Sequence, residues 1–430
     1  MFEIDWQTPH LWRKTSKEPH VVRPALAGDR EVDVAVVGAG FTGLSPALAM
    51  AEAGLSVAVL EGNEVGSAAS GRNNGLVIPH HSKATPAEIE AAFGRVLGER
   101  YNAMVAEASR TAFGLIERHG IRCDGVQQGW IQPAHSPQAL ARGRQFYEGW
   151  KAFGADVAWL DAAEASQRVG SAYLGGWIAA EGGHVNPYAL AQGLAAAAER
   201  AGVALFERSL VSAVTPEGPR WRLRTSGGSL LARQVLLASN ALTGAFWPKL
   251  AEAVIPLQVY QAASEPLPEA ARATILQGNP AVSDTRRDMR YFNYDAEFRI
   301  VTGGTHTVWA KARSRGLAAT SRMLAKAFPQ LGPAPKVTEY WEGVFGVVPD
   351  RKPRLMRLAP GVVFAGIYSG RGVALSLTLG QRVGAWLAGR LTDDQMPLPV
   401  TDLRLVPGHA VAVQVARRIH PLHRLQDRFS

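Results

Sequence analysis

The stretch VDVAVVGAGFTGLSPALAMAEAGLSVAVLEGN, residues 32–63, decides the fold of this chain. Residues 33–40 form an apolar, valine-rich run that ends in glycines, which predicts a buried parallel strand. Residues 41–54 repeat leucine and alanine at helical spacing up to a terminal glycine, and residues 55–63 form a second β-branched run. The stretch therefore predicts a strand–helix–strand unit within about 30 residues.

Three glycines of this unit, Gly38, Gly40 and Gly43, fit the pattern G-x-G-x-x-G. Glycine permits a tight turn, close approach of a pyrophosphate to bare backbone, and close packing of the helix on the strand. The pyrophosphate then lies at the positive N-terminus of the helix. Glu61 ends the second strand, where an acid accepts hydrogen bonds from the ribose of the adenosine half. The pattern would be weak in an isolated loop, but in this context it predicts a dinucleotide site.

The composition is that of a globular protein. The chain has 430 residues, 47% of them hydrophobic and 19% charged, which excludes a disordered chain. No apolar run approaches the ~18 residues of a membrane span, and we expect no export signal. The single cysteine, Cys123, forms no intrachain disulfide and no thiolate metal site alone, so we expect a cytoplasmic protein and no metal.

The net charge of +9 leaves two interpretations open. A basic chain is typical of proteins that bind nucleic acid or an anionic surface. Alternatively, the excess is spread thinly over an arginine-rich and alanine-rich chain. No block of five like charges occurs, which favours the second interpretation.

The remainder of the chain contains both helix-like and strand-like patterns of apolar residues. Helical patterning covers 86–120, 138–153, 186–202 and 323–331. Short strands are expected at 155–160, 173–181, 203–207, 210–214, 221–225 and 234–241, with several more between 254 and 309. Residues 361–389 predict a strand, a glycine-rich turn and a long helix.

A loop of small residues, VGSAASGRNNGLVIPHH (65–81), follows Glu61 and is too polar for a core. Together with residues 32–44, with QVLLASNA (234–241) and with GIYSGRGVALSLTLG (366–380), it resembles the FAD-dependent amine and amino-acid oxidases of the D-amino-acid oxidase superfamily. Five further stretches resemble the gamma-glutamylputrescine oxidase branch. They are GGHVNPYAL (182–190), VIPLQVYQAASEPLPE (254–269), FRIVTGG (298–304), AFPQL (327–331) and YWEGVFGVVPDRKP (340–353). The resemblance covers about residues 25–395.

The resemblance implies an α/β fold in which a Rossmann-like FAD-binding domain of the glutathione-reductase type is interleaved with an antiparallel-sheet α+β substrate domain. The FAD-binding domain would comprise 31–88, 160–250 and 345–395, and the substrate domain 89–159 and 251–344. Residues 1–30 would form an N-terminal extension and 396–430 a C-terminal tail.

The resemblance also implies which residues hold FAD, and with Cys123 far from any linking position we expect the FAD to be non-covalent. The pyrophosphate and ribose would lie on the glycine turn and on Glu61, and the flavin near the small-residue loop and the start of the last helix, whose positive end would face the ring. By motif position the full set is Gly38, Gly40, Phe41, Thr42, Gly43, Glu61, Gly62, Ser70, Gly71, Arg72, Asn73, Asn74, Gly75, Leu76, Val211, Ser239, Asn240, Gly366, Ser369, Gly370, Arg371, Gly372 and Val373.

The candidate substrate site departs from the family in one respect. Members similar to glycine oxidase have a carboxylate-binding arginine after W-x-G, where this chain has Val344 and Phe345. An apolar residue makes no bidentate carboxylate contact. Arg371, which stands where the branch usually has histidine, and Arg290 are the alternatives. The candidate catalytic and lining residues are Tyr260, Tyr291, Trp341, Phe345 and Arg371, with His80 and His81 following the flavin loop.

The activity implied by the resemblance is oxidation of an amine or amino-acid-like substrate to an imine, with oxygen as the acceptor and hydrogen peroxide as a product. The alternative is a dehydrogenase that passes electrons to a quinone or another carrier. A nucleic-acid-associated flavoprotein and a non-catalytic FAD-binding subunit are weaker alternatives, and we expect no nucleic-acid partner. The segment 405–429 alternates apolar residues with arginines; we expect it to pack on protein rather than on a membrane, because Pro421 interrupts the pattern.

Overall fold

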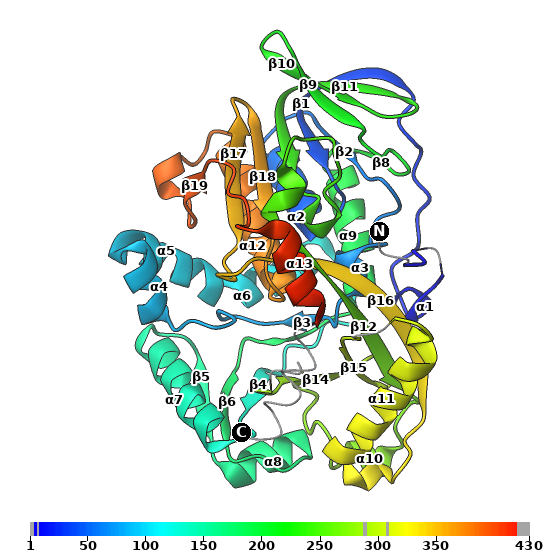
Figure 1. Cartoon of the computed structure of the whole chain (residues 1–430), viewed down its shortest axis with the longest axis vertical. Helices are drawn as coiled ribbons and strands as arrows, with labels where there is room; N and C mark the ends of the chain where they lie inside the picture. The colour runs from blue at the N-terminus through cyan, green and yellow to red at the C-terminus, as the bar shows by residue number, and fades with distance from the viewer. Residues whose placement is uncertain (1–3, 7, 287–289, 307–308, 419–430) are drawn as a thin grey trace.

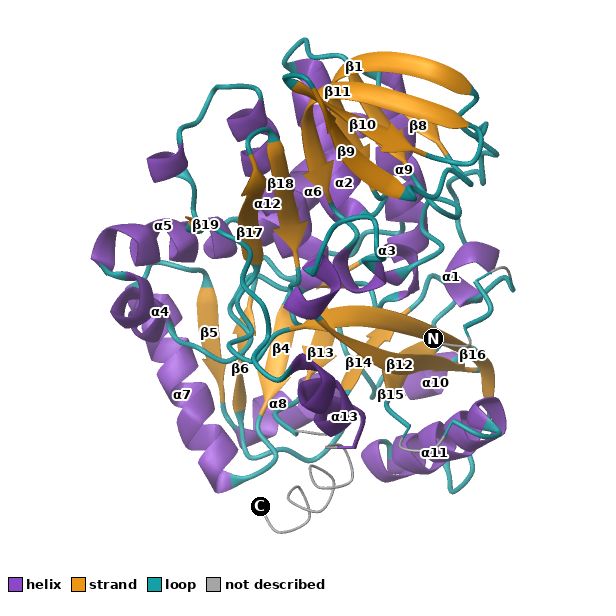
Figure 2. Ribbon diagram, turned by 45° about the horizontal axis from the view of Figure 1, so that its top comes forward, coloured by secondary structure: helices purple, strands orange, loops and turns teal. Residues whose placement is uncertain are grey.

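The computed structural model describes residues 4–6, 8–286, 290–306 and 309–418. Two large β-sheets, each with helices packed on it, form the molecule (Figures 1 and 2). A two-stranded ribbon, β3 (Leu76–Val77) with β7 (Gly183–His184), lies between the two units.

The first sheet is built around the strand predicted by the opening stretch. β1 (Gly28–Val37) lies parallel to β2 (Val57–Leu60) on one side and to β11 (Gly228–Leu237) on the other. The parallel order continues outward with β8 (Ala204–Phe206) and β18 (Val362–Gly366). The predicted strand–helix–strand unit is thereby confirmed. The edges are completed by β9 (Ala213–Glu217), β10 (Arg220–Arg224), β17 (Arg354–Ala359) and β19 (Val400–Thr401).

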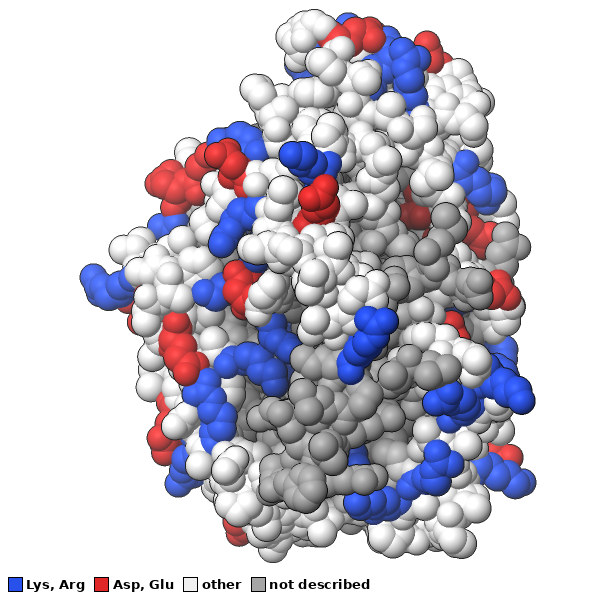
Figure 3. All heavy atoms as spheres, in the orientation of Figure 1, with Lys and Arg blue, Asp and Glu red and all other residues white. Residues whose placement is uncertain are grey.

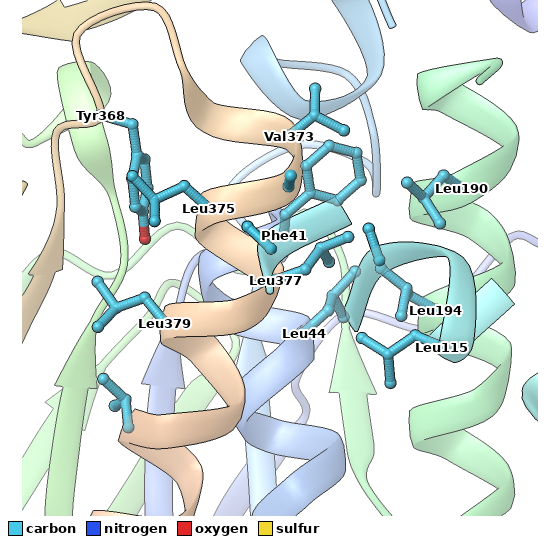
Figure 4. Packing of buried hydrophobic residues seen from close by; sticks show 14 of the residues in the cluster. Phe41, Leu44, Leu115, Leu190, Leu194, Tyr368, Val373, Leu375, Leu377 and Leu379 are labelled. Carbon is cyan, nitrogen blue, oxygen red and sulfur yellow. The ribbon is translucent and has the colours of Figure 1, made fainter. Parts of the chain in front are cut away.

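Alternate residues of β1 enter two separate cores, as a strand buried on both faces requires. Val34 and Val36 pack against helices, whereas Ala35 and Val37 face the other side of the sheet. The helical side comprises α2 (Phe41–Glu52), α6 (Ala108–His119), α9 (Pro187–Arg200) and α12 (Gly372–Leu387), and Figure 4 shows their leucines interdigitating around Phe41.

Helices α2 and α12 approach each other closely because two glycines of α12 lie at their contact. A Cβ atom built on Gly380 would lie 2.7 Å from the Cβ of Ser45, and one on Gly384 would lie 2.7 Å from the Cβ of Ala49. The Oγ of Ser45 donates a hydrogen bond of 2.7 Å to the carbonyl of Leu377. The two helices are thereby held closely against each other along their middle turns.

The second sheet has the order β16-β12-β15-β14-β13-β4-β6-β5 and is mostly antiparallel. Its long pair is β12 (Ile255–Ser264) with β16 (Val337–Val347). The others are β4 (Trp130–Pro133), β5 (Val157–Leu160), β6 (Gly176–Ala179), β13 (Ala281–Ser283), β14 (Tyr291–Tyr294) and β15 (Ile300–Gly304). One face packs on α8 (Ala162–Val169) and α11 (Ala312–Ala327), and the other faces the first unit. The fold class expected from the sequence is confirmed.

Three details differ from the sequence-based expectations. Helical patterning over 86–120 becomes α4 (Pro86–Phe93), α5 (Arg95–Ala106) and α6, because Gly94 at φ 81° ends the first helix. The apolar run 234–241 leaves the strand after Leu237 and continues as a short 3-10 turn. Strand β6, although it lies within 160–250, pairs with β4 and β5 in the second sheet.

Both ends of the described chain pack near the pair formed by β12 and β16. At the N-terminal end, α1 (Leu11–Lys14) packs against α9 and β16. At the C-terminal end, α13 (His409–Arg418) packs along β12, and the Nε2 of His409 lies 2.9 Å from the carbonyl oxygen of Val254. The tail beyond Arg418, with Pro421, lies outside the described residues. No helix in the described part of the chain is long and apolar enough to cross a membrane.

Charged side chains of both signs are distributed over the face drawn in Figure 3. Many arginines of the surface are paired with acids, as in Arg142 with Glu88 and Arg382 with Glu107, both at 2.6 Å.

Candidate cofactor and substrate site

The turn between β1 and α2 has no room for side chains. A Cβ on Gly43 would lie 1.9 Å from the carbonyl oxygen of Gly38, which itself has φ 104°. A Cβ on Gly40 would lie 2.8 Å from the Oγ of Ser70. Each glycine of the predicted pattern therefore keeps backbone close to backbone or to the small-residue loop, which a side chain at these three positions would prevent.

The N-terminus of α2 offers hydrogen-bond donors at this turn. The Phe41 N–H donates to Ser70 Oγ at 3.0 Å, and the Ala39 N–H donates to a carboxylate oxygen of Glu61 at 2.8 Å. The N–H groups of Gly40 and Thr42 have no partner among the residues that the structure describes. Free N–H groups at a helix N-terminus suit a phosphate, so the cradle fits the pyrophosphate of a dinucleotide.

Glu61 lies at the end of β2 beside the turn. Its other carboxylate oxygen accepts from the Asn63 N–H at 2.9 Å, and burial raises the pKa of this carboxyl group. The loop after β8 lies next to it, since the Ser209 N–H donates to the Glu61 carbonyl and the side chain of Leu210 approaches Gly62. Val211, expected on the adenine side, is buried in this loop.

The small-residue loop, residues 65–81, contains the short helix α3 (Ala69–Arg72) and the strand β3. A Cβ on Gly71 would lie 2.1 Å from the carbonyl oxygen of Gly66, and Gly75 has φ 80°. The loop is held by its asparagines: Asn73 Oδ1 accepts from the Gly75 N–H at 2.7 Å, and Asn74 Oδ1 accepts from the Leu76 N–H at 3.1 Å.

Arg72 of the same loop is buried. Its Nη2 donates to the carbonyl of Asp5 at 2.7 Å, and its guanidinium lies over the ring of Trp6 at 5.5 Å. Its Nε and Nη1 have no partner in the described part of the chain. Burial lowers the pKa of Arg72 to about 10.

The turn from β18 into α12 is the second glycine-rich element of the site. Gly366, Ile367, Ser369 and Gly370 all have positive φ, at 154°, 63°, 51° and 94°. A β-branched residue at such an angle is strained by about 1–3 kcal/mol, and such strain concentrates at functional sites. After this turn, Arg371 is the N-cap residue of α12. Gly372 and Val373 form the first turn of the helix, and Val373 lies beside Phe41 (Figure 4).

The end of β11 lies against this turn. A Cβ on Gly366 would lie 4.0 Å from the Cα of Asn240, which has φ 46°. The Oδ1 of Asn240 is buried and finds no partner in the described residues, whereas Ser239 Oγ lies 2.6 Å from Thr243 Oγ1.

The aromatic candidates separate onto the two faces of the second sheet. Gln261 and Trp341 are register partners on the face toward the first unit, and the Tyr291 hydroxyl donates to Gln261 Oε1 at 2.6 Å. Phe345 lies on the same face, with its ring 3.9 Å from a Cβ built on Gly370. Tyr260, one residue before Gln261, points to the opposite face.

On that opposite face the Tyr260 ring stacks on His306 at 4.4 Å and on Tyr340 at 5.5 Å. The helix α11 covers this face, and its Gly316 lies against the Tyr340 ring. The structure therefore brings together Tyr291, Trp341, Phe345 and Arg371 but not Tyr260, since neighbouring residues of a strand point to opposite faces.

Arg371 and two histidines line a pocket together with Tyr368 and Lys352. Burial and, to a smaller extent, the nearby Arg351 lower the pKa of Arg371 to about 10. His80 is buried, its Nδ1 lies 2.6 Å from the carbonyl oxygen of His81, and its Nε2 has no partner among the described residues. Burial lowers the pKa of His80 well below its usual range, so this histidine is neutral.

Two tryptophans that the sequence interpretation did not single out contact residues of the candidate site. Trp130 lies under both Arg371, at 5.3 Å, and His80, at 4.1 Å. The Trp12 indole donates to the carbonyl of Asn73 at 2.8 Å. Neither stands in a motif, and no signal in the sequence marked them. Among the described residues no cluster of three His, Cys, Asp or Glu side chains suits a metal, and Cys123 is buried.

The fold and the two glycine-rich elements are those of a dinucleotide-binding oxidoreductase. Comparison with known proteins gives the family: residues 33–386 match the DAO family, described as FAD dependent oxidoreductase. The chain belongs to this family, as the sequence predicted.

Individual relatives agree with this assignment. The chain is 31% identical over 360 residues to the gamma-glutamylputrescine oxidoreductase of Escherichia coli, covering 83% of this chain and 84% of the relative. It is 29% identical over 400 residues to the probable oxidoreductase OrdL of Rhizobium meliloti, covering 91% and 92%. The structure of glycine oxidase from Geobacillus kaustophilus has the same fold, with a TM-score of 0.69 at 23% identity over 84% of this chain and 96% of that one.

Proposed function

We propose that this protein oxidises the C–N bond of an amine or amino-acid-like substrate, with FAD bound non-covalently along the glycine turn, Glu61 and the loop 70–76. The observation that carries the proposal is the position of the strained turn 366–370. This turn starts α12 directly opposite the aromatic face of the second sheet, with Phe345 beside Gly370. When bound, FAD supplies the acceptor for a hydride from the carbon next to nitrogen.

The residues of this chain would hold the substrate amine in its neutral form, which hydride loss requires. Trp130, Tyr291 and Phe345 give the site an apolar wall, and burial disfavours an ammonium group. The charge of Arg371 opposes an ammonium as well. The imine product would then hydrolyse in water, so no acid–base triad is needed.

Arg371 would select the substrate class. It is a guanidinium without an acidic partner in the described residues, over an aromatic ring and beside the neutral His80. A guanidinium in such a site binds a carboxylate in bidentate fashion. We therefore propose an amine that also carries a carboxylate group, held by Arg371 in place of the arginine that glycine-oxidase-like members have after W-x-G.

The experiment is a substrate panel tested with the purified, FAD-loaded protein. Amines with and without a carboxylate are mixed anaerobically with the protein, and bleaching of the flavin absorption is followed. Bleaching by a carboxylate-bearing amine, followed by hydrogen peroxide formation when oxygen is admitted, is the expected result. Bleaching without peroxide, reversed by a quinone or dye, would replace the oxidase with a dehydrogenase. The absence of bleaching by the whole panel would contradict amine oxidation.

A further inference from the structure

We propose that Trp12 and Trp341 are positioning residues of the cofactor site. Their indole N–H groups hold two successive carbonyls of the loop 72–74 and so direct the N–H groups of Asn73 and Asn74 toward the flavin. The inference rests on the FAD site proposed above and adds the N-terminal segment to it.

The two indoles act on adjacent peptide groups. Trp341 Nε1 donates to the carbonyl oxygen of Arg72 at 2.9 Å, and Trp12 Nε1 donates to that of Asn73 at 2.8 Å. Both tryptophans are buried, and their rings meet edge to face at 6.1 Å. One comes from α1 and the other from β16, so the loop is held from two separate parts of the chain.

Because a peptide group is planar, these two hydrogen bonds also set the direction of the Asn73 and Asn74 N–H groups. In a trans peptide the N–H of a residue points opposite to the carbonyl of the preceding residue. With the Arg72 carbonyl on Trp341 and the Asn73 carbonyl on Trp12, the N–H groups of Asn73 and Asn74 point away from the tryptophans.

These two donors are also the ones that the loop leaves available. The next two N–H groups, of Gly75 and Leu76, are taken by the side chains of Asn73 and Asn74. No partner for the N–H of Asn73 or of Asn74 occurs within the described residues. Two neighbouring donors of this kind suit the acceptor atoms of a flavin ring, since a backbone N–H that the protein leaves unpaired needs a ligand or water as its partner.

The N-terminal segment is anchored on both units, which makes it a fixed support. Asn186 Nδ2 donates to the Trp12 carbonyl at 2.9 Å in the first unit. Lys14 pairs with Glu339 of β16 at 2.9 Å in the second. The two indole hydrogen bonds therefore tie the orientation of the loop to both units and to α1.

The test compares Trp12→Phe and Trp341→Phe with Trp221→Phe. Phenylalanine keeps an aromatic ring and lacks the N–H. Trp221 is the matched control because its indole also donates to a backbone carbonyl, that of Pro360 at 3.0 Å, on the far side of the first sheet. Apoprotein is reconstituted with FAD, and the FAD dissociation constant, the visible spectrum of the bound flavin and its two-electron reduction potential are measured.

We expect each site variant to weaken FAD binding by about 5- to 20-fold, the loss of roughly one hydrogen bond's contribution. We also expect the visible spectrum and the reduction potential of the bound flavin to shift in the site variants at saturating FAD. In Trp221→Phe the FAD dissociation constant should stay within about twofold of the wild-type value, with the spectrum and the potential unchanged. Folded site variants with unchanged affinity, spectrum and potential would overturn the inference, even if their melting temperatures fall. If Trp341→Phe does not fold, the FAD affinity, spectrum and potential of Trp12→Phe alone test the inference. These readouts need no substrate, so failure of amine oxidation would leave them intact.

Discussion

The guanidinium carbon of Arg371, at the start of α12, lies 5.3 Å from the centre of the Trp130 ring on β4. This contact joins the first unit to the second across the proposed substrate site. The arginine has no acidic partner in the described part of the chain, so its positive charge is available to a ligand. A cation over an indole ring is stabilised without being neutralised.

Replacing Arg371 with leucine should therefore impair binding of a carboxylate-bearing amine. We expect KM to rise by about 10- to 100-fold, because a charge-assisted bidentate contact is lost, with a smaller change in kcat. Steady-state peroxide formation measures both. Arg144→Leu is the matched control, since Arg144 lies over Trp159 at 4.5 Å on α7 (Pro137–Ala152), away from the site. An unchanged KM in Arg371→Leu would exclude this residue from carboxylate binding.

The lowered pKa of Arg371 predicts that ligand binding weakens at alkaline pH. Because burial lowers the pKa of Arg371 to about 10, the guanidinium is charged below that pH and neutral above it. A carboxylate ligand should therefore bind with constant affinity from pH 7 to 9 and lose affinity above about pH 10. Titration of the flavin spectrum with a carboxylate inhibitor measures this. In Arg371→Leu the loss above pH 10 should disappear; its persistence there would assign the titration to another group.

Gly43→Ala should abolish FAD binding. The added Cβ would lie 1.9 Å from the carbonyl oxygen of Gly38, and a backbone atom cannot move aside as a flexible side chain does. We expect the variant to be purified without yellow colour and without the proposed amine-oxidising activity. Gly114→Ala on α6 is the control: no atom lies within 4 Å of its new Cβ, and we expect full flavin content and a stability gain of about 0.5–1 kcal/mol. A flavin-loaded Gly43→Ala protein would contradict the role of the turn.

Gly384→Val should destabilise the packing of α12 on α2. The Cβ alone would approach the Ala49 Cβ at 2.7 Å and the Pro46 carbonyl oxygen at 2.9 Å, so the helices must separate. Overpacking of this kind costs about 1–3 kcal/mol or more. Urea unfolding of the FAD-loaded protein measures it. Gly114→Val, in open space on α6, separates this clash from the lower helix propensity of valine. Equal losses in the two variants would argue against close packing at Gly384.

Acid should destabilise the protein through its buried histidines. Burial lowers the pKa of His81 and of His184 to about 4, below the usual value of 6.5. Below pH 6.5 these histidines bind protons in the unfolded chain but stay neutral in the folded chain. The free energy of unfolding therefore falls as pH drops from 6.5 to 4. The slope is at most about 1.4 kcal/mol per pH unit for each histidine.

Denaturant unfolding at a series of pH values checks this prediction. His81→Gln retains a donor toward Asn102, whose Oδ1 lies 2.8 Å from the histidine Nε2, and it should reduce the slope between pH 6.5 and 4. Above pH 7 the free energy of unfolding should depend on pH in the same way in the wild type and in the variant. An unchanged slope in the variant would show that other groups dominate acid unfolding.

The opening stretch illustrates what can be predicted locally. The glycine spacing, the helical repeat and the two β-branched runs all lie within 32 consecutive residues, so the unit at Gly38, Gly40 and Gly43 followed from the sequence. Tyr260 shows the opposite case. Its neighbourhood resembles the family's, yet the register of β12 against β16 turns its ring toward α11. A shift of one residue along a strand reverses the face, and only the long-range pairing fixes it.

The sequence by itself determined the dinucleotide fold, the family and the loop and turn on either side of the proposed cofactor site, because these depend on short-range patterns of glycine and apolar residues. Only the tertiary structure decided which side chains complete the site. Trp12 and Trp341, 329 positions apart, meet on one loop, and Trp130 lies under Arg371. Such contacts arise from the docking of one sheet on another unit, and no local spacing encodes that docking.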